Sequence, residues 1–196
     1  MFSIDDECLE PKRDNPITDD ISYMAQAFAV SMRSYDPSTQ VGSCYVDKDG
    51  KLLSVGCNQV PPGWDIDRFP WGTKEEYGTK NSKYTYIIHS EVAASHNYNG
   101  SFKDFEGGTL YVTLFPCTNC AKEIASLGIK RVVYLNERDN CEDFEYANIL
   151  LQEVGVECVR FRDIVDSIDG IEIDFTADEK NVVKIRKRGE IKNTIE

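Results

Sequence analysis

The feature that most constrains the fold is an alternation of helical and strand patterns in the second half of the chain. From residue 89 onward, apolar residues recur at helical spacing and then in short strand-like runs. The expected helices cover residues 89–97, 117–127 and 144–154, and the expected strands cover residues 109–114, 131–135 and 156–161. Gly128 and Gly155 stand where helices should end. Helices that alternate with strands predict a layered α/β sheet whose strands run parallel in this half.

The first half predicts one helix and a hairpin. Thr18 or Asp19 suits the cap of a helix that should end near Ser34. Two strand patterns, at residues 42–46 and 52–57, flank a turn-forming sequence. The segment 59–88 is rich in Pro, Gly, Trp and Tyr without a steady period, which is typical of a functional loop. We therefore expect an N-terminal arm at residues 1–18, one domain at 19–162 and a tail at 163–196, which holds either a hairpin (171–175 with 182–186) or no regular structure.

Composition limits the classes of partner. The chain has 196 residues, 41% of them hydrophobic, and no apolar run approaches the roughly 18 residues that cross a bilayer. Its acidic N-terminus does not resemble a targeting signal, so we expect a cytoplasmic protein without a membrane partner. The net charge of −12 argues against a nucleic acid as main partner, because phosphate neutralisation needs a basic surface. A mononucleotide is not excluded, since one phosphate needs only a few local donors.

Two short motifs carry the chemistry. His89-Ser90-Glu91 precedes Pro116-Cys117-Thr118-Asn119-Cys120. Each half is weak evidence alone, because a His-x-Glu triplet is common and a Cys-x-x-Cys can be a redox pair. In this order, and on alternating helices and strands, they match the signature of zinc-dependent nucleobase deaminases.

The residue types suit a catalytic metal. Catalytic zinc takes three protein ligands and leaves its fourth position for water, and His89, Cys117 and Cys120 supply three. Cysteines three apart at a helix start face the same side, where the amide ends favour thiolates. Glu91 is then free to transfer protons. The competing interpretations are an ordinary helix histidine, core or redox thiols and a solvated helix-start charge; His96 is interpreted as non-catalytic, or as part of a second metal site with Cys44 or Cys57.

At these residues the chain resembles the cytidine and deoxycytidylate deaminase superfamily. The resemblance covers residues 21–161 and includes the stretches 32–42, 56–58, 114–122 and 128–130. It implies a three-layer α/β fold, with a mixed five-stranded sheet and helices on both faces. It also implies that His89, Cys117 and Cys120 ligate Zn²⁺, that Glu91 is the catalytic proton shuttle, and that a nucleotide is bound by Asn58, Arg33, Ser34 and Gln40. Asn58 would contact the sugar and base, and the other three the phosphate end.

The long segment between Asn58 and His89 favours the deoxycytidylate branch of this superfamily. That branch implies hydrolysis of dCMP to dUMP and ammonia in a homo-oligomer. The cations and tryptophans of the segment, Lys83 among them, are predicted to surround a phosphate. Gln59 stands where the family usually has Gly after Asn58, which leaves regulation by nucleotides undetermined, whereas Ser90 in the His-x-Glu triplet is a tolerable change. Ala93 and Ser95 replace the family's usual Asn and Ile after the Glu, so dCTP, a modified cytosine nucleotide or a nucleic acid stays an alternative substrate. A non-catalytic zinc-binding regulatory protein is the other alternative.

Overall fold

The computed structural model describes residues 14, 16–138, 141–165, 168–173 and 183–187, so most of the expected N-terminal arm lies outside the described residues. A five-stranded sheet has the order β2-β1-β3-β4-β5. Its strands are β1 (Gly42–Val46), β2 (Leu52–Cys57), β3 (Thr109–Leu114), β4 (Arg131–Asn136) and β5 (Glu157–Arg160). β1 is antiparallel to both of its neighbours, with Cys44 opposite Val55 and Tyr111, whereas β3, β4 and β5 are parallel. The prediction of a mixed five-stranded sheet is confirmed.

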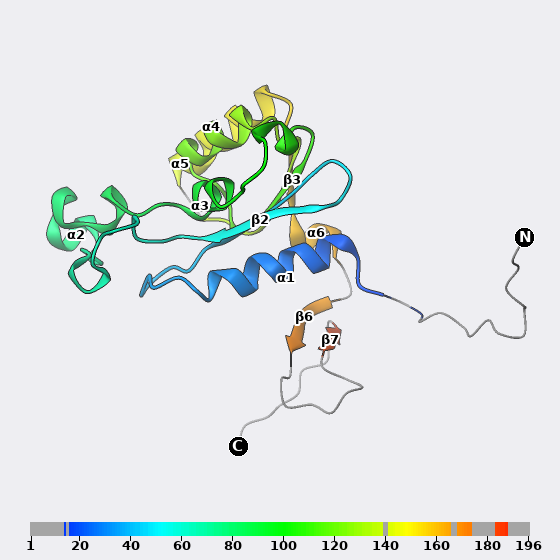
Figure 1. Ribbon diagram of the computed structural model, residues 1–196, viewed down its shortest axis with the longest axis horizontal. Coiled ribbons are helices and arrows are strands. Elements are labelled where there is room, and N and C mark those ends of the chain that lie inside the picture. Colours follow the sequence, from blue (N-terminus) through cyan, green and yellow to red (C-terminus); the bar gives the residue numbers. More distant parts are fainter. Residues whose placement is uncertain (1–13, 15, 139–140, 166–167, 174–182, 188–196) are drawn as a thin grey trace, which may run out of the picture.

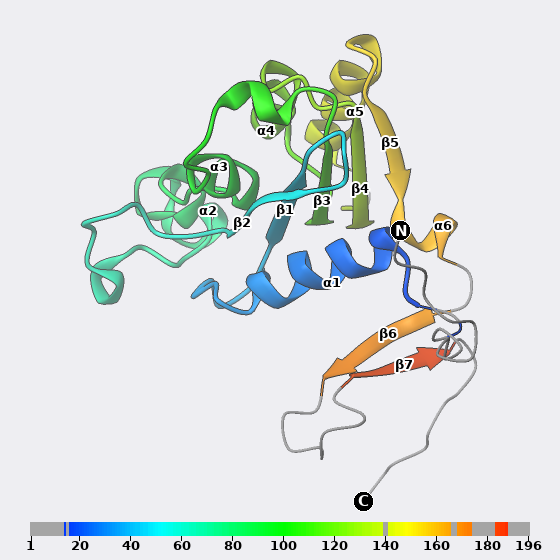
Figure 2. The same cartoon turned by 45° about the vertical axis from the view of Figure 1, so that its right-hand side comes forward.

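Helices cover both faces of this sheet (Figures 1 and 2). α1 (Asp19–Ser31) packs against one face, and α3 (Ser90–His96), α4 (Thr118–Ser126) and α5 (Glu142–Glu153) lie over the other. A short helix, α6 (Phe161–Ile164), follows β5. No helix in the described part of the chain is both long and apolar enough to cross a membrane.

Alternating strand residues build one core on each face. In β1, Tyr45 packs with Leu110 and Ala94 on the side of α3 to α5, whereas Cys44 and Val46 pack on the side of α1. Two glycines permit the close approach of the helices: a Cβ at Gly42 would lie 1.9 Å from the Ala27 carbonyl oxygen, and one at Gly56 would lie 2.4 Å from the Ala94 amide nitrogen. The sheet therefore holds α1 and α3 in direct contact with its antiparallel end.

Helix boundaries follow local hydrogen bonds. The Thr18 side chain accepts a bond from the Ile21 amide at the start of α1. α1 ends at Ser31 rather than near Ser34: the amides of Arg33 and Ser34 bond to carbonyls three residues back, as in a turn, and the Ser34 hydroxyl donates to the carbonyl of Asn58. Gly128 and Gly155 have φ of 73° and 74°, as expected for glycines that end helices.

Backbone hydrogen bonds join the two ends of the 59–88 segment. Gln59 and Ile88 exchange two backbone hydrogen bonds of 2.9 Å. The segment contains α2 (Lys74–Tyr77) and three single 3₁₀ turns, at Ile66–Arg68, Thr79–Asn81 and Lys83–Thr85, so it is more regular than its composition indicates. An aromatic cluster gathers within it, with neighbouring ring centroids 4.6–5.4 Å apart: Trp64, Phe69, Trp71 and Tyr86.

In the C-terminal tail, β6 (Ile168–Ile173) and β7 (Val183–Lys187) pair antiparallel. Two paired strands are therefore found in the tail, but the first lies at residues 168–173 rather than 171–175, and residues 174–182 lie outside the described residues.

Candidate active site

Two helix starts bring three metal-ligand types together. His89 is the N-cap residue of α3, Cys117 is that of α4, and Cys120 lies in the first turn of α4. The Sγ atoms of Cys117 and Cys120 each lie 3.4 Å from His89 Nδ1, and the ligand atoms are all within 4.8 Å of one another. No other cluster of this kind occurs among the residues that the structure describes, and His96 is exposed outside it.

The donors fit zinc by their chemistry. One imidazole and two sulfurs form a soft to borderline set that zinc accepts in catalytic sites. The hydrogen bond from Cys120, together with His89, lowers the pKa of Cys117 to about 4, so a thiolate is already favoured there. The bond to Cys117 in turn raises the pKa of His89. Because the group has three protein donors within the described chain, it matches the ligand count of a catalytic zinc rather than of a four-ligand structural one.

Glu91 is buried next to these donors. Its side chain is 4% exposed, and Oε2 accepts a bond of 3.0 Å from the Ser90 hydroxyl. That hydroxyl lies 2.7 Å from the Ser43 hydroxyl on β1, so the sheet fixes one carboxyl oxygen of Glu91. Burial raises the pKa of Glu91 more than nearby His89 lowers it. The carboxyl group is therefore suited to hold and release a proton nearer neutral pH than a solvated glutamate.

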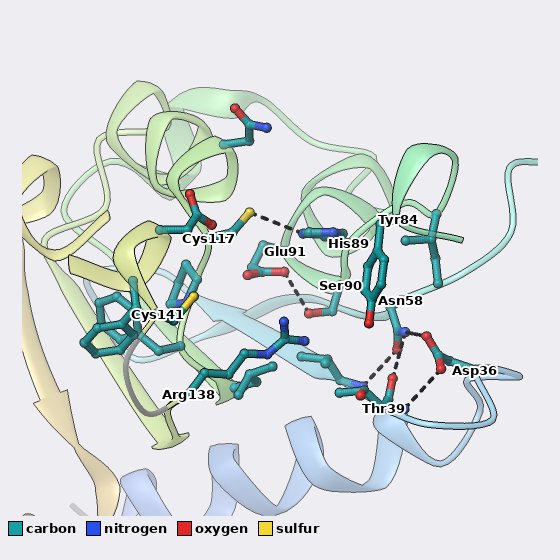
Figure 3. A pocket seen from close by; sticks show the side chains of 18 of the residues that line it. Asp36, Thr39, Asn58, Tyr84, His89, Ser90, Glu91, Cys117, Arg138 and Cys141 are labelled. Atoms are coloured by element: carbon teal, nitrogen blue, oxygen red, sulfur yellow. Dashed lines mark hydrogen bonds between the residues drawn. The ribbon is translucent and has the colours of Figure 1, made fainter. Parts of the chain in front are cut away.

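A pocket of about 310 Å³ opens from this centre, in the size range of small-ligand sites. His89, Glu91 and Cys117 line one end, and Asp36, Thr39, Asn58 and Tyr84 line the other (Figure 3). Phe115, Ile87 and Leu114 add apolar surface. The pocket thus offers apolar surface for a ring together with polar groups. We call the end at the metal donors the inner end and the end at Asp36 and Asn58 the outer end.

Of the four residues predicted to bind the nucleotide, Asn58 alone lines this pocket. Arg33 is exposed elsewhere. Ser34 and Gln40 contact the backbone of two lining residues: Ser34 donates to the Asn58 carbonyl, and Gln40 donates to the Asp36 carbonyl. The structure therefore does not bring Arg33, Ser34 and Gln40 to the pocket surface.

Several pocket residues were not predicted, and Arg138 is the most informative. It follows β4 and its side chain extends across the pocket towards Ser90 (Figure 3). Its position after the carboxyl end of a parallel strand is the available sequence signal, since ligands gather at that edge. Asp143, at the start of α5, accepts bonds from the Thr118 amide and hydroxyl and thereby caps the zinc-site helix α4. Nothing in the local sequence around Asp143 indicates this contact.

The fold and the donor set define a zinc-dependent deaminase. A family model described as the cytidine and deoxycytidylate deaminase zinc-binding region matches residues 17–136, and the chain belongs to this family. It is 37% identical to mouse deoxycytidylate deaminase over 84% of this chain and 89% of the mouse protein. The human deoxycytidylate deaminase is 36% identical over the same shares of the two chains. The dCMP deaminase of cyanophage S-TIM5, solved in complex with dCMP and dUMP, is 27% identical with a TM-score of 0.55 and covers 71% of this chain and 93% of its own.

Proposed function

We propose that this protein hydrolyses dCMP to dUMP and ammonia. The observation that carries the chemistry is the buried Glu91 carboxyl beside His89, Cys117 and Cys120 at the inner end of the pocket. The substrate is supported by the relatives, because the mouse and human proteins are deoxycytidylate deaminases and the cyanophage structure contains dCMP and dUMP. In the balanced reaction, water adds to the cytosine ring and the exocyclic amino group leaves as ammonia.

Different residues of the site are assigned to metal binding and to proton transfer. Zinc, when held by His89, Cys117 and Cys120, would supply Lewis acidity that lowers the pKa of a bound water to about 7. Because Ser90 holds Oε2 of Glu91, Oε1 is the oxygen available to move protons. We assign Glu91 to accept a proton from the attacking water, place it on ring N3 and later deliver one to the leaving amino nitrogen.

An ammonia-release assay tests this function. The purified zinc-loaded protein is given dCMP, dCTP, CMP, deoxycytidine and cytosine in parallel. We expect the highest kcat/KM for dCMP. A preference for dCTP would keep the chemistry and change the substrate, whereas no release from any compound would support the non-catalytic alternative and contradict the proposal.

Arg138 is the residue we expect to favour a phosphorylated substrate. It lines the pocket without a hydrogen bond or ion pair to the described residues, whereas Lys83, the other lining cation, is bound to Asp36. On a chain of net charge −12, a phosphate dianion needs such a local donor. Arg138→Gln should lower kcat/KM for dCMP by about 10- to 100-fold and leave that for deoxycytidine nearly unchanged, since a charge-assisted bond contributes about 1.5–3 kcal/mol.

The matched control for Arg138 is Arg160→Gln. Arg160 is paired with Glu137 at 3.7 Å and does not line the pocket. This variant should therefore keep the wild-type ratio of kcat/KM for dCMP to kcat/KM for deoxycytidine. Equal losses of kcat/KM for dCMP and deoxycytidine in Arg138→Gln would mean that Arg138 does not bind the phosphate.

We also propose that the protein is a homo-oligomer. Aromatic residues are enriched at interfaces, and the 59–88 segment presents Trp64 and Tyr77 with 40% and 61% exposure. Multi-angle light scattering should give a mass that is a multiple of 22.2 kDa. A monomer at working concentration would refute this. The cytoplasmic location, and the domain limits at residues 19 and 162, stay predictions.

A further inference from the structure

A buried ion pair joins the 59–88 segment to the loop that precedes β1. Lys83 Nζ lies 2.5 Å from Asp36 Oδ1, with the two side chains 2% and 3% exposed, and also donates to the Ser38 hydroxyl. The other ion pairs of the described residues are more exposed; the most similar, Arg131–Asp20, has side chains 28% and 27% exposed. Burying a lysine and an aspartate costs desolvation that their attraction does not reliably recover. The mechanism proposed above uses neither residue, so the pair calls for another explanation.

Asp36 connects Lys83 to the wall of the pocket. Its Oδ1 accepts bonds from the amides of Ser38 (2.9 Å) and Thr39 (3.0 Å). Its Oδ2 accepts a bond of 3.3 Å from Asn58 Nδ2. Burial raises the pKa of Asp36, but Lys83 and the two amides outweigh this and lower it, so the carboxylate is ionised. One carboxylate therefore fixes the loop before β1, the 59–88 segment and the residue that follows β2.

Asn58 is fixed in orientation as a result. Besides Asp36, Nδ2 donates to the Thr39 carbonyl at 3.0 Å, and Oδ1 accepts from the Val41 amide at 2.8 Å. A flipped amide group would lose all three bonds. Lys83 is also followed directly by Tyr84, which lines the same end of the pocket as Thr39 and Asn58 (Figure 3).

We propose that Lys83 and Asp36 are positioning residues for substrate binding, an inference that rests on the proposed function. They hold Asn58, Thr39 and Tyr84 at the outer end of the pocket before a nucleotide enters. The metal donors and Glu91 lie at the inner end and receive no hydrogen bond from this network. A preformed wall lowers the ordering cost of binding, so losing it should weaken nucleotide affinity more than it slows the chemical step.

The test is the double variant Lys83→Met/Asp36→Asn, which removes both charges so that neither is left buried alone. With full zinc content, we expect KM for dCMP and the Kd of dUMP to rise by at least about tenfold, and kcat to stay within about threefold of wild type. In the ligand-free protein, amide hydrogen exchange should become faster in residues 38–41 and 84–88 and stay unchanged in α4. If the double variant does not fold, Lys83→Arg serves instead, because it keeps a cation beside Asp36 but changes its geometry; smaller shifts in the same direction are expected.

The matched control is Asp20→Asn/Arg131→Met. This pair, joined at 2.7 Å, lies outside the pocket and should leave KM and dUMP affinity unchanged. Wild-type KM, dUMP affinity and exchange in the Lys83/Asp36 variants would overturn the inference, and so would a joint loss of kcat and zinc. If the wild-type protein does not deaminate dCMP, the proposed function fails by itself. The exchange measurement in the ligand-free protein still decides whether the pair orders the wall.

Discussion

Glu91→Gln is expected to lower kcat for dCMP deamination by at least about 10²–10⁴-fold, the range typical of a lost general acid–base group. Glutamine has nearly the shape of glutamate, and its carbonyl oxygen can still accept the bond that Ser90 donates to Oε2. It cannot accept the proton of the attacking water or return one to the leaving amine. Because Glu91 is buried with a raised pKa, its loss should not cost a stabilising ion pair.

Single-turnover ammonia release, zinc content and Tm are measured together on this variant. Glu123→Gln is the matched control, since Glu123 lies on α4, accepts a bond from Ser95 and does not line the pocket. We expect the control to retain turnover. Near-normal turnover in Glu91→Gln with full zinc would show that another group moves the protons.

Cys120→Ala is expected to weaken zinc binding by more than about 100-fold and to abolish activity at ordinary zinc concentrations. The estimate is a lower bound, because even the loss of a group that only orients a ligand costs about 10–100-fold in metal affinity. Cys120 is buried in the first turn of α4, and its Sγ lies 3.4 Å from His89 Nδ1, so its loss removes one of the three donors of the cluster. The protein should contain one zinc per chain, and the variant less.

Competition with a chromogenic chelator measures this affinity. Cys158→Ala is the matched control: Cys158 is half-buried on β5, its burial raises its pKa to about 11, and it lies outside the donor cluster. The control should bind zinc as the wild type does. If Cys120→Ala still holds one zinc per chain tightly, Cys120 is not a zinc ligand. Chelated wild-type protein should lose activity, recover it with added Zn²⁺ and unfold at a lower temperature, because a ligand that binds only the folded state stabilises it.

Stability should depend on pH through Asp36. Its folded-state pKa is lowered from the ordinary value of 3.8, so the carboxylate contributes stability that is present above that value and is lost as pH falls through the folded pKa. The contribution of the Asp36 carboxylate is thus complete at neutral pH, and substrate affinity there should not be limited by protonation of Asp36.

The local sequence determined most of the elements of this fold. Hydrophobic periodicity placed β1, β2 and β3 at the residues where the structure has them, and it located α3, α4 and α5 to within two residues. It does so because side chains repeat every two residues in a strand and every 3.6 in a helix, whatever lies nearby. The spacing of His89, Glu91, Cys117 and Cys120 likewise indicated the zinc chemistry, because one helix turn and a His-x-Glu step set which side chains can share an ion.

Only the tertiary structure decided which polar groups form the outer end of the pocket. Lys83 and Asp36 are 47 residues apart, and Asp143 caps α4 from 25 residues beyond Thr118. Such contacts depend on how the 59–88 segment and α5 pack, which no periodic pattern records. For the same reason Arg33 is exposed and Arg138 lies in the pocket, although Arg33 belongs to the stretch that resembles the family. The sequence shows which side chains are charged, but the packing of segments distant along the chain determines which groups they contact.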